Sequence, residues 1–288
     1  MRLQVIGDPV LHSKSPVIHA AMLTELGLDV PYDAHVVRRG ELPDYLRWAK
    51  ENGVTGFNAT MPHKEDLLPL LDEIDPAAKA VGAVNTVCLR DGKWMGFNTD
   101  GGGAVAALKD TLGIDPAGMT VTLLGAGGAA KAVALALSAN RAERVYVCNR
   151  TLSRAEALCA HDPLGRLSPS AFGPDTLGRL AAQSQLLVNC TNLGMEGCPQ
   201  QFEDFGFLDA LRSDAGVFDL IYHPAETELL AQARRRGLRT LNGLPMLVNQ
   251  AVLALEHFLA RPLDRPKMAA AAAAALLFLE GNSRQEEL

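Results

Sequence analysis

The chain has 288 residues, of which 48% are hydrophobic and 21% charged, and its formal net charge is −6 at pH 7. This length and composition predict a globular protein of two ordinary domains and exclude a disordered chain. The negative charge and the absence of a Lys/Arg block argue against nucleic acid or an anionic membrane as the main partner.

The five cysteines include no C-x-x-C pair. We therefore expect buried thiols in a cytoplasmic protein, and no residue spacing predicts a metal site. The first residues lack the layout of a signal peptide, and residues 268–279 are too few and too rich in alanine to span a bilayer. We expect a terminal packing helix there instead.

Segments rich in β-branched and apolar residues alternate with segments of helical periodicity, which predicts βαβ units and a largely parallel sheet. In the first hundred residues we expect strands at 3–6, 32–37, 53–58, 84–90 and 93–96, and helices at 16–26 and 43–51. The dipeptide Asp91-Gly92 predicts a hairpin between the last two of these strands.

A predicted helix at 100–112 leads to an apolar strand at 120–124, so a second domain is expected to begin within residues 101–118. Further strands are expected at 144–148, 185–189, 217–220 and 240–241, with helices at 129–140 and 153–159. A helical tail follows from Pro245 onward.

The string from Thr120 to Ala130 supplies the G-x-G-x-x-A form of the dinucleotide-binding fingerprint between a strand and a helix. Gly125 permits the tight turn, Gly127 lets the backbone approach a pyrophosphate, and Ala130 permits close packing of helix on strand. The amides and the positive dipole at the helix N-terminus favour phosphate.

The end of the next strand indicates which dinucleotide binds. A site for NAD usually has Asp or Glu there, to hold the ribose 2′-hydroxyl. This chain has Asn149-Arg150-Thr151 instead, with Arg154 one helical turn beyond. Two guanidinium groups suit a 2′-phosphate, which favours NADP. In the alternative, Asn149 is a turn residue, Thr151 or Ser153 a helix cap, and the arginines are solvated.

Two serines stand between the first strand and the first helix, in the string from Gly7 to Pro16. Ser13 and Ser15 alternate, so both hydroxyls can donate to one carboxylate near a helix N-terminus. In the alternative, Ser15 only caps the helix, with Pro16 at its first position.

A lysine in a polar loop after the third strand is the candidate proton carrier. Lys64 in a partly enclosed cleft can act as a general acid or base, although a single lysine is usually a solvated surface charge. Nothing in the spacing favours the neighbouring His63. Asp100 precedes three glycines at a helix start, where it can serve as an N-cap, pair with Lys64, or do both.

Eight motifs in one order resemble the shikimate dehydrogenase family along nearly the whole chain. They are H-S-K-S-P (12–16), N-A-T-M-P-H-K (58–64), G-A-V-N-T (82–86), G-F-N-T-D (96–100), G-A-G-G-A (125–129), N-R-T-x-x-R (149–154), D-L-I-Y-H-P (219–224) and N-G-L-P-M-L-V-N-Q (242–250). Two departures from the family pattern are Cys190 in place of alanine and Pro245 in place of glycine.

The resemblance implies an α/β fold with an N-terminal substrate-binding catalytic domain at 1–100 and a Rossmann NADP-binding domain at 101–242. It also implies that helices at 243–288 pack back on the first domain and that the active site lies between the two domains. The reaction it implies is the reversible reduction of 3-dehydroshikimate by NADPH, a step in chorismate and aromatic amino-acid biosynthesis.

The resemblance also assigns roles to residues. Lys64, aided by Asp100, is the catalytic group, and Ser13 and Ser15 bind the substrate carboxylate. The residues that surround the ring hydroxyls and the reacting carbonyl are Asn58, Thr60, Asn85, Asp100, Tyr222 and Gln250. The residues expected to bind NADP are Gly125, Ala126, Gly127, Gly128, Ala129, Asn149, Arg150, Thr151 and Arg154, with Leu220, Gly243 and Met246 lining the nicotinamide pocket.

Two alternatives stay open at this point. The first is a quinate/shikimate dehydrogenase of the same family with broader substrate range or use of NAD. The second is a non-catalytic sensor that binds shikimate-like acids, which predicts loss of Lys64 or Asp100, and both residues are present. The expected partner is a small-molecule substrate, with no nucleic acid and no membrane, and the expected assembly is a monomer or a homodimer.

Overall fold

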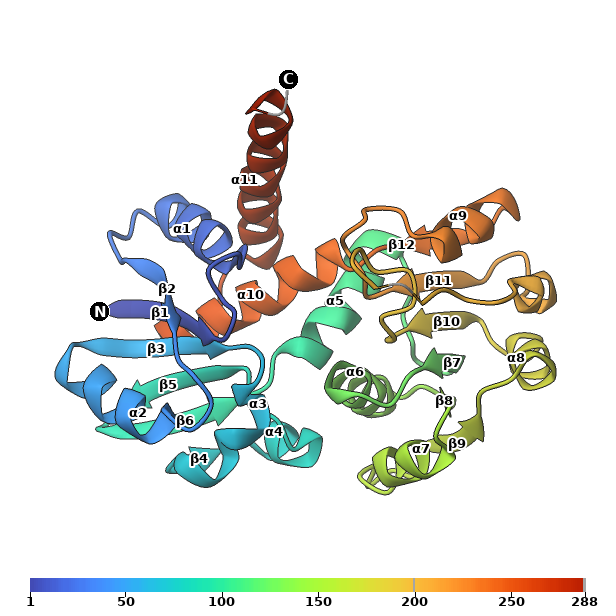
Figure 1. Cartoon of the computed structure of the whole chain (residues 1–288), viewed down its shortest axis with the longest axis horizontal. Coiled ribbons are helices and arrows are strands. Elements are labelled where there is room, and N and C mark those ends of the chain that lie inside the picture. Colours follow the sequence, from blue (N-terminus) through green and yellow to red (C-terminus); the bar gives the residue numbers. More distant parts are fainter. Residues whose placement is uncertain (199, 287–288) are drawn as a thin grey trace. The chain divides into compact units, whose positions relative to one another are not determined.

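The computed structural model describes residues 1–198 and 200–286, and the side chains of residues 1–198 and 200–279. The chain divides into two compact units. One comprises Met1–Thr99 and the residues from Val248 onward, and the other comprises Asp100–Leu247. Each unit contains its own sheet with helices packed on it (Figure 1). In the part of the chain that the structure describes, no helix is long and apolar enough to cross a membrane.

The first unit is built on a mixed sheet with the strand order β2-β1-β3-β5-β6-β4. The strands are β1 (Arg2–Gly7), β2 (Tyr32–Val36), β3 (Val54–Ala59), β4 (Glu73–Ile74), β5 (Thr86–Arg90) and β6 (Lys93–Phe97). β1 is parallel to β2 and β3, whereas β5 is antiparallel to both β3 and β6. β4 is parallel to β6, so three of the five strand pairings are parallel and the antiparallel ones are both made by β5.

The predicted hairpin is confirmed at Asp91-Gly92, which joins β5 to β6. Both turn residues have positive φ, 50° at Asp91 and 76° at Gly92. Two positive φ angles match the twist of the flanking strands, which explains why Asp-Gly is favoured in such turns.

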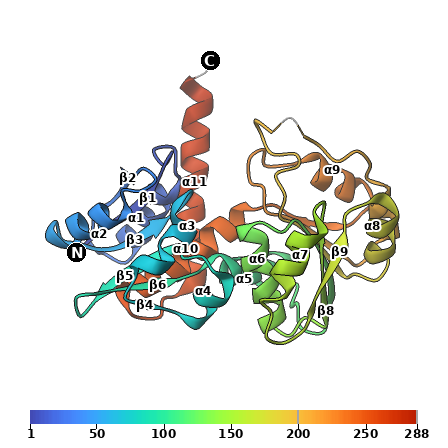
Figure 2. The same cartoon turned by 60° about the horizontal axis from the view of Figure 1, so that its bottom comes forward.

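The helices of the first unit are α1 (Ser15–Glu25), α2 (Leu42–Glu51), α3 (His63–Asp66), α4 (Pro76–Val81), the part of α10 (Leu244–Leu259) from Val248 onward, and α11 (Arg265–Glu286). α11 packs along α1 (Figure 2), so the C-terminal helix belongs to the same unit as the N-terminal strand. Phe57 of β3 lies at the centre of the core, with Tyr45 of α2 and Trp94 of β6 both packed edge-on against it.

The second unit has a fully parallel sheet with the order β12-β11-β10-β7-β8-β9. The strands are β7 (Thr120–Leu124), β8 (Arg144–Asn149), β9 (Leu167–Ala171), β10 (Leu186–Asn189), β11 (Gly216–Asp219) and β12 (Arg239–Leu241). Counted within the unit this order is 3-2-1-4-5-6, the Rossmann arrangement. The strand order reverses between β7 and β10, which is where such sheets bind dinucleotides.

The helices of the second unit are α5 (Asp100–Leu112), α6 (Gly128–Ala139), α7 (Leu152–Cys159), α8 (Pro174–Ala181), α9 (Glu228–Arg235) and the start of α10 (Leu244–Leu259). α5 and α6 pack closely because Gly101 has no side chain. A Cβ on Gly101 would lie 2.4 Å from the carbonyl oxygen of Ala132.

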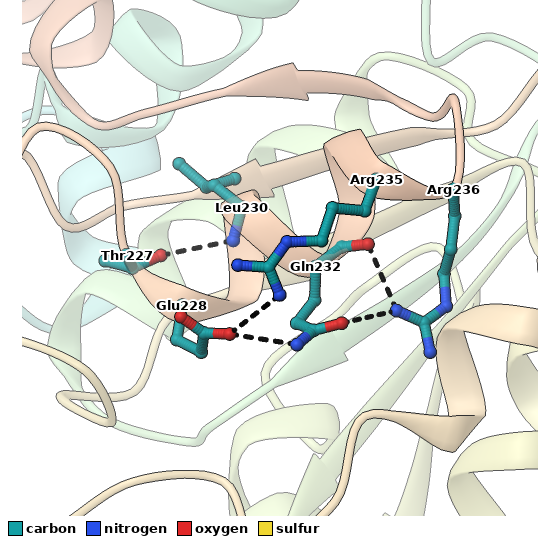
Figure 3. Close-up of polar contacts among 6 residues, drawn as sticks. All are labelled: Thr227, Glu228, Leu230, Gln232, Arg235 and Arg236. Carbon is teal, nitrogen blue, oxygen red and sulfur yellow. Dashed lines mark hydrogen bonds and ion pairs between the residues drawn. The ribbon is translucent and has the colours of Figure 1, made fainter.

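Several short elements escaped the sequence-based prediction, among them β4, β9, α4, α8 and α9. β9 reads Leu-Ser-Pro-Ser-Ala and lies at the edge of its sheet, where a proline is tolerated but the apolar alternation is lost. α9 has only eight residues and is held by its own polar contacts (Figure 3). Thr227 caps its first turn at the amide of Leu230, and Glu228 accepts a hydrogen bond from Gln232.

Candidate active site

The glycine-rich loop after β7 leaves open space at the N-terminus of α6. Gly125 has φ +105°, and a Cβ there would lie 3.1 Å from the carbonyl oxygen of Cys190. Around Gly127 and Gly128 no atom lies within 4 Å of where a Cβ would be, and both residues are exposed. The start of this helix therefore opens onto space that a phosphate can fill, which fits the pyrophosphate of a dinucleotide.

A cavity of about 210 Å³ extends from this loop along the carboxyl ends of β7, β8 and β10. The residues that line it are Gly125, Ala126, Gly127, Cys148, Asn149, Arg150, Phe172, Cys190, Thr191, Asn192 and Leu193. A second cavity of about 570 Å³ shares Arg150, Phe172 and Leu193 with the first. The cavity lies at the reversal of strand order, as expected for a dinucleotide site. Thr191 and Asn192 also line the cavity, although the sequence assigned neither of them a role.

The two arginines predicted to bind a 2′-phosphate are exposed beside the first cavity. Arg150 lines it, and Arg154 lies in the first turn of α7. Neither side chain forms an ion pair within the described residues. Thr151 occupies the N-cap position of α7 but makes no side-chain cap bond. The side-chain amide of Asn149 donates to the carbonyl of Thr151 and fixes the turn.

A buried carboxylate ties together the loops after β10 and β11. Asp219 is fully buried, and its Oδ1 accepts hydrogen bonds from Nδ2 of Asn189 (3.0 Å) and the amide of Ile221 (3.1 Å). Its Oδ2 accepts from the hydroxyl of Thr227 at 2.7 Å. Burial raises the pKa of Asp219 to about 6. Because Asn189 in turn accepts from the amide and hydroxyl of Thr191, this network fixes one wall of the first cavity.

The residues expected near the nicotinamide lie at the carboxyl end of β11 and the start of α10. Gly243 is buried, and its amide donates to the carbonyl of Ile221 at 3.0 Å. Met246 is also buried, whereas Tyr222 is 40% exposed. Asn242 accepts from the amide of Leu244 and so begins α10.

In the first unit, the loops that carry the serines and the lysine follow the neighbouring parallel strands β1 and β3. The amide of Asp8 donates to the carbonyl of Met61 at 3.0 Å, which joins the two loops at their start. The two loops can lie this close only because residue 7 is glycine, since a Cβ on Gly7 would lie 2.4 Å from Cγ2 of Thr60. The predicted substrate residues of both loops therefore lie at one edge of the sheet.

Ser15 does not cap α1, so that alternative is wrong. The N-cap position is occupied by Lys14, and Ser15 is the first residue of the helix, followed by Pro16. Ser13 accepts a hydrogen bond from the amide of Ser15 at 3.2 Å. Because Ser13 uses an oxygen lone pair in this contact, its hydroxyl keeps a hydrogen to donate. The side chain of Ser15 is hydrogen-bonded to the phenol of Tyr32.

Lys64 and His63 are adjacent in α3 but lie in different surroundings. His63 is fully buried, and its Nε2 lies 2.6 Å from the carbonyl of Val37, so that nitrogen carries a proton and donates it. Lys64 is partly exposed, and its backbone carbonyl accepts from the amide of Val84. Only Lys64 can therefore exchange a proton with a ligand. Asp100 is the first residue of α5 in the second unit, and its pairing with Lys64 stays a prediction.

Asn58 and Asn85 belong to one buried hydrogen-bonded chain that also contains Gln250. Asn58 donates to the hydroxyl of Thr86, and Asn85 donates to that of Thr99. The hydroxyl of Thr99 lies 3.4 Å from Oε1 of Gln250. The structure thus brings three of the predicted substrate residues together within the first unit.

Some members of this site carried little or no signal in the sequence. Thr86 and Thr99 stand inside recognised motifs, but residue type alone assigned them no role.

Among the described residues, no group of three or more His, Cys, Asp or Glu side chains is arranged to hold a metal ion.

Both units match models of one protein family. A family model described as the shikimate dehydrogenase substrate binding domain matches residues 5–87, and one described as shikimate / quinate 5-dehydrogenase matches residues 108–192. Shikimate dehydrogenase (NADP(+)) from Methylobacterium radiotolerans is 42% identical over 273 residues, 93% of this chain and 94% of that protein.

Two solved structures are similar to nearly the whole chain. Shikimate 5-dehydrogenase from Thermus thermophilus, in complex with NADP(H) and shikimate, has a TM-score of 0.81 at 38% identity, covering 96% of this chain and 99% of that one. Ligand-free 5-ketofructose reductase from Gluconobacter sp. strain CHM43 has a TM-score of 0.84 at 33% identity, covering 95% and 98%.

Proposed function

We propose that this chain, which belongs to the shikimate dehydrogenase family, catalyses the reversible reduction of 3-dehydroshikimate to shikimate with NADPH. It is an NADP-dependent oxidoreductase that acts on a CH–OH group, and its step belongs to chorismate and aromatic amino-acid biosynthesis. The observation that carries the proposal is the match to this family across both units, substrate-binding and cofactor-binding alike.

The second unit holds NADP in this proposal. The amides of Gly125, Gly127 and their neighbours Ala126, Gly128 and Ala129 face the pyrophosphate, which the open space at this helix start supports. Asn149, Arg150, Thr151 and Arg154 hold the 2′-phosphate, and the exposed guanidinium groups suit its charge. Leu220, Gly243 and Met246 line the nicotinamide pocket. When bound, NADPH supplies the hydride.

Lys64 donates the proton to the oxygen of the reacting carbonyl as that oxygen becomes an alkoxide, and its charge stabilises the developing negative charge. In the reverse direction the same amine accepts the proton of the substrate hydroxyl. Asp100 sets the position and the protonation of Lys64. The burial of His63 against a backbone carbonyl supports Lys64 as the proton carrier of this loop.

The first unit supplies most of the groups that recognise the substrate. Ser13 and Ser15 donate to its carboxylate, and their hydroxyls lie near the N-terminus of α1, which favours an anion. The ring hydroxyls and the carbonyl are surrounded by Asn58, Thr60, Asn85, Asp100, Tyr222 and Gln250. The hydrogen-bonded chain through Asn58, Asn85 and Gln250 supports this role, because it holds three amides in fixed orientations.

The same proposal places the enzyme in the cytoplasm as a monomer or a homodimer. All five cysteines are free thiols in the structure, which suits a reducing compartment.

The direct test measures shikimate and quinate oxidation side by side, each with NADP+ and with NAD+. We expect the highest kcat/KM for shikimate with NADP+. The similarity to a 5-ketofructose reductase shows why the substrate must be tested, since a related chain is named for a different ketone. A preference for quinate or for NAD+ would favour the quinate/shikimate dehydrogenase alternative. Binding of shikimate without any turnover would favour the non-catalytic sensor.

A further inference from the structure

Thr86 is fully buried at the start of β5, between two asparagines that the proposed function assigns to the substrate. Its Oγ1 accepts a hydrogen bond from Nδ2 of Asn58 at 3.0 Å. The same oxygen lies 2.9 Å from Oδ1 of Asn85, which has no hydrogen to give, so Thr86 donates there. One hydroxyl therefore accepts from the first asparagine and donates to the second.

This hydroxyl is the middle of a longer chain that runs in one direction. The chain begins at Tyr32 of β2, whose phenol donates to Oδ1 of Asn58 at 2.7 Å. It continues from Nδ2 of Asn85 to the hydroxyl of Thr99 at 3.0 Å, and from there towards Oε1 of Gln250 at 3.4 Å. The hydroxyl of Thr99 also lies 3.3 Å from Oδ1 of Asn85, and the amide of Thr99 donates to that oxygen at 2.9 Å. These partners give the amides of Asn58 and Asn85 one orientation that satisfies all of their contacts.

Asn58 shows what this orientation means for a ligand. Its Nδ2 has two hydrogens, and both are donated, one to Thr86 and one to the carbonyl of Asn85 at 3.1 Å. Its Oδ1 accepts from Tyr32, and the ring of His19 lies beside the same side chain. With 8% of its surface exposed, Asn58 can present to a substrate only this oxygen. It therefore accepts a hydrogen bond from a hydroxyl and cannot donate one.

We propose that Thr86 is a positioning residue for substrate recognition, which orients the amides of Asn58 and Asn85 without touching the substrate itself. The proposal rests on the proposed function for the roles of these two asparagines. Without the hydroxyl, one hydrogen of Asn58 and one acceptor site of Asn85 lose their partner. Asn58 keeps its contacts with Tyr32 and the carbonyl of Asn85, and Asn85 keeps those with the amide and hydroxyl of Thr99, so both amides are held by fewer partners than before. A rotated Asn58 offers hydrogens where the substrate hydroxyl needs an acceptor.

The test compares Thr86→Val, Thr86→Ser and the matched control Thr122→Val. Thr122 is a fully buried threonine in β7 of the other unit, hydrogen-bonded to Ser184 at 2.9 Å. Each protein is assayed for the KM of shikimate and of NADP+, for the calorimetric Kd of shikimate, and for Tm. The Kd does not depend on turnover, so it separates binding from chemistry.

We expect T86V to raise the KM and Kd of shikimate about tenfold, with the KM of NADP+ changed less than about twofold. T86S keeps the hydroxyl and should restore both shikimate constants. T122V should lower Tm to a similar extent and leave both KM values unchanged. If T86V does not fold, Tyr32→Phe removes the preceding donor of the chain and should show the same selective loss of shikimate binding.

Unchanged shikimate constants in T86V, or an equal rise in the KM of NADP+, would overturn the proposal and leave a purely structural role. Failure of T86S to restore binding would also overturn it. These results differ from a failure of the proposed function. In that case the unaltered enzyme itself neither binds nor oxidises shikimate, and the inference about Thr86 falls with it.

Discussion

Gly243 lies so close to the backbone of Leu220 that a Cβ at Gly243 would be 1.9 Å from the carbonyl oxygen of Leu220. Both residues belong to the second unit and are assigned to the nicotinamide pocket. The φ angle of Gly243 is not positive, so glycine is required here for space and not for conformation. The start of α10 and the end of β11 can approach this closely only if the residue has no side chain.

Gly243→Ala should therefore destabilise the second unit and weaken NADP+ binding. A methyl group inserted against a backbone atom that cannot rotate away is expected to lower the free energy of unfolding by more than about 3 kcal/mol. The measurements are the denaturant midpoint and the Kd of NADP+ by fluorescence titration. Gly178→Ala in α8 is the control, because no atom lies within 4 Å of a Cβ there. That variant should be as stable as the parent or slightly more so. Equal effects of the two substitutions would contradict the account.

Arg150→Ala combined with Arg154→Ala should reverse part of the cofactor preference. Two exposed guanidinium groups can form charge-assisted hydrogen bonds to the 2′-phosphate. Loss of these bonds should raise the KM of NADP+ at least about tenfold. The KM of NAD+, which lacks the 2′-phosphate, should change less than about threefold. Arg144→Ala at the opposite end of β8 is the control, and it should alter neither value. A parallel rise for both cofactors would show that the arginines act on the shared part of the dinucleotide or on the fold.

His19 predicts a pH dependence of stability. Its ring is fully buried, stacks on Tyr32 with the ring centroids 4.2 Å apart, and lies beside the side chain of Asn58. Burial lowers the pKa of His19 to about 3, from 6.5. Below pH 6.5 the unfolded chain binds a proton that the folded chain does not bind. The free energy of unfolding therefore falls with decreasing pH, by up to about 1.4 kcal/mol per pH unit from this group.

His19→Phe keeps the stacking and removes the titration. Urea unfolding of both proteins at pH 7, 5.5 and 4.5 should show the variant gaining stability relative to the parent as the pH falls. The gain at pH 4.5 should be about 2 kcal/mol larger than at pH 7. Because both proteins share every other titrating group, the difference between the two curves reports on His19. Parallel curves would show that His19 is protonated in the folded state or is already structured in the unfolded chain.

The cofactor half of the protein was predictable because its signals are local. Strand β7, the loop from Gly125 and helix α6 follow one another within twenty residues, and their predicted bounds agree with the structure to within one residue. The hairpin at Asp91-Gly92 was predictable for the same reason. Edge strand β9 was not, since a proline interrupts its apolar alternation and its pairing with β8 is not a local signal. The short helix α9 was not, since eight residues carry little periodicity and its cap Thr227 is also tied to Asp219.

In the substrate-binding unit, contacts between residues far apart in the sequence could not be predicted. Asn58 and Asn85 were identified from their motifs, but Tyr32 was not. It stands on β2, separated from β3 by β1, and its phenol reaches Asn58 only because the strand order places them near each other. Likewise Asp219 was known from the sequence only as the first residue of a motif. Its role in holding Asn189 and Thr227 depends on pairing of β10 with β11, which local patterns do not specify.

The central claim is that this chain oxidises shikimate with NADP+ by means of Lys64, and steady-state kinetics of Lys64→Ala test it most directly. Loss of a general acid–base group should lower kcat about 10²- to 10⁴-fold, while the Kd of shikimate stays within a few-fold of the parent. The control is Lys79→Ala, at an exposed lysine of α4, which should leave kcat unchanged. A Lys64→Ala enzyme with near-normal turnover of shikimate would contradict the account.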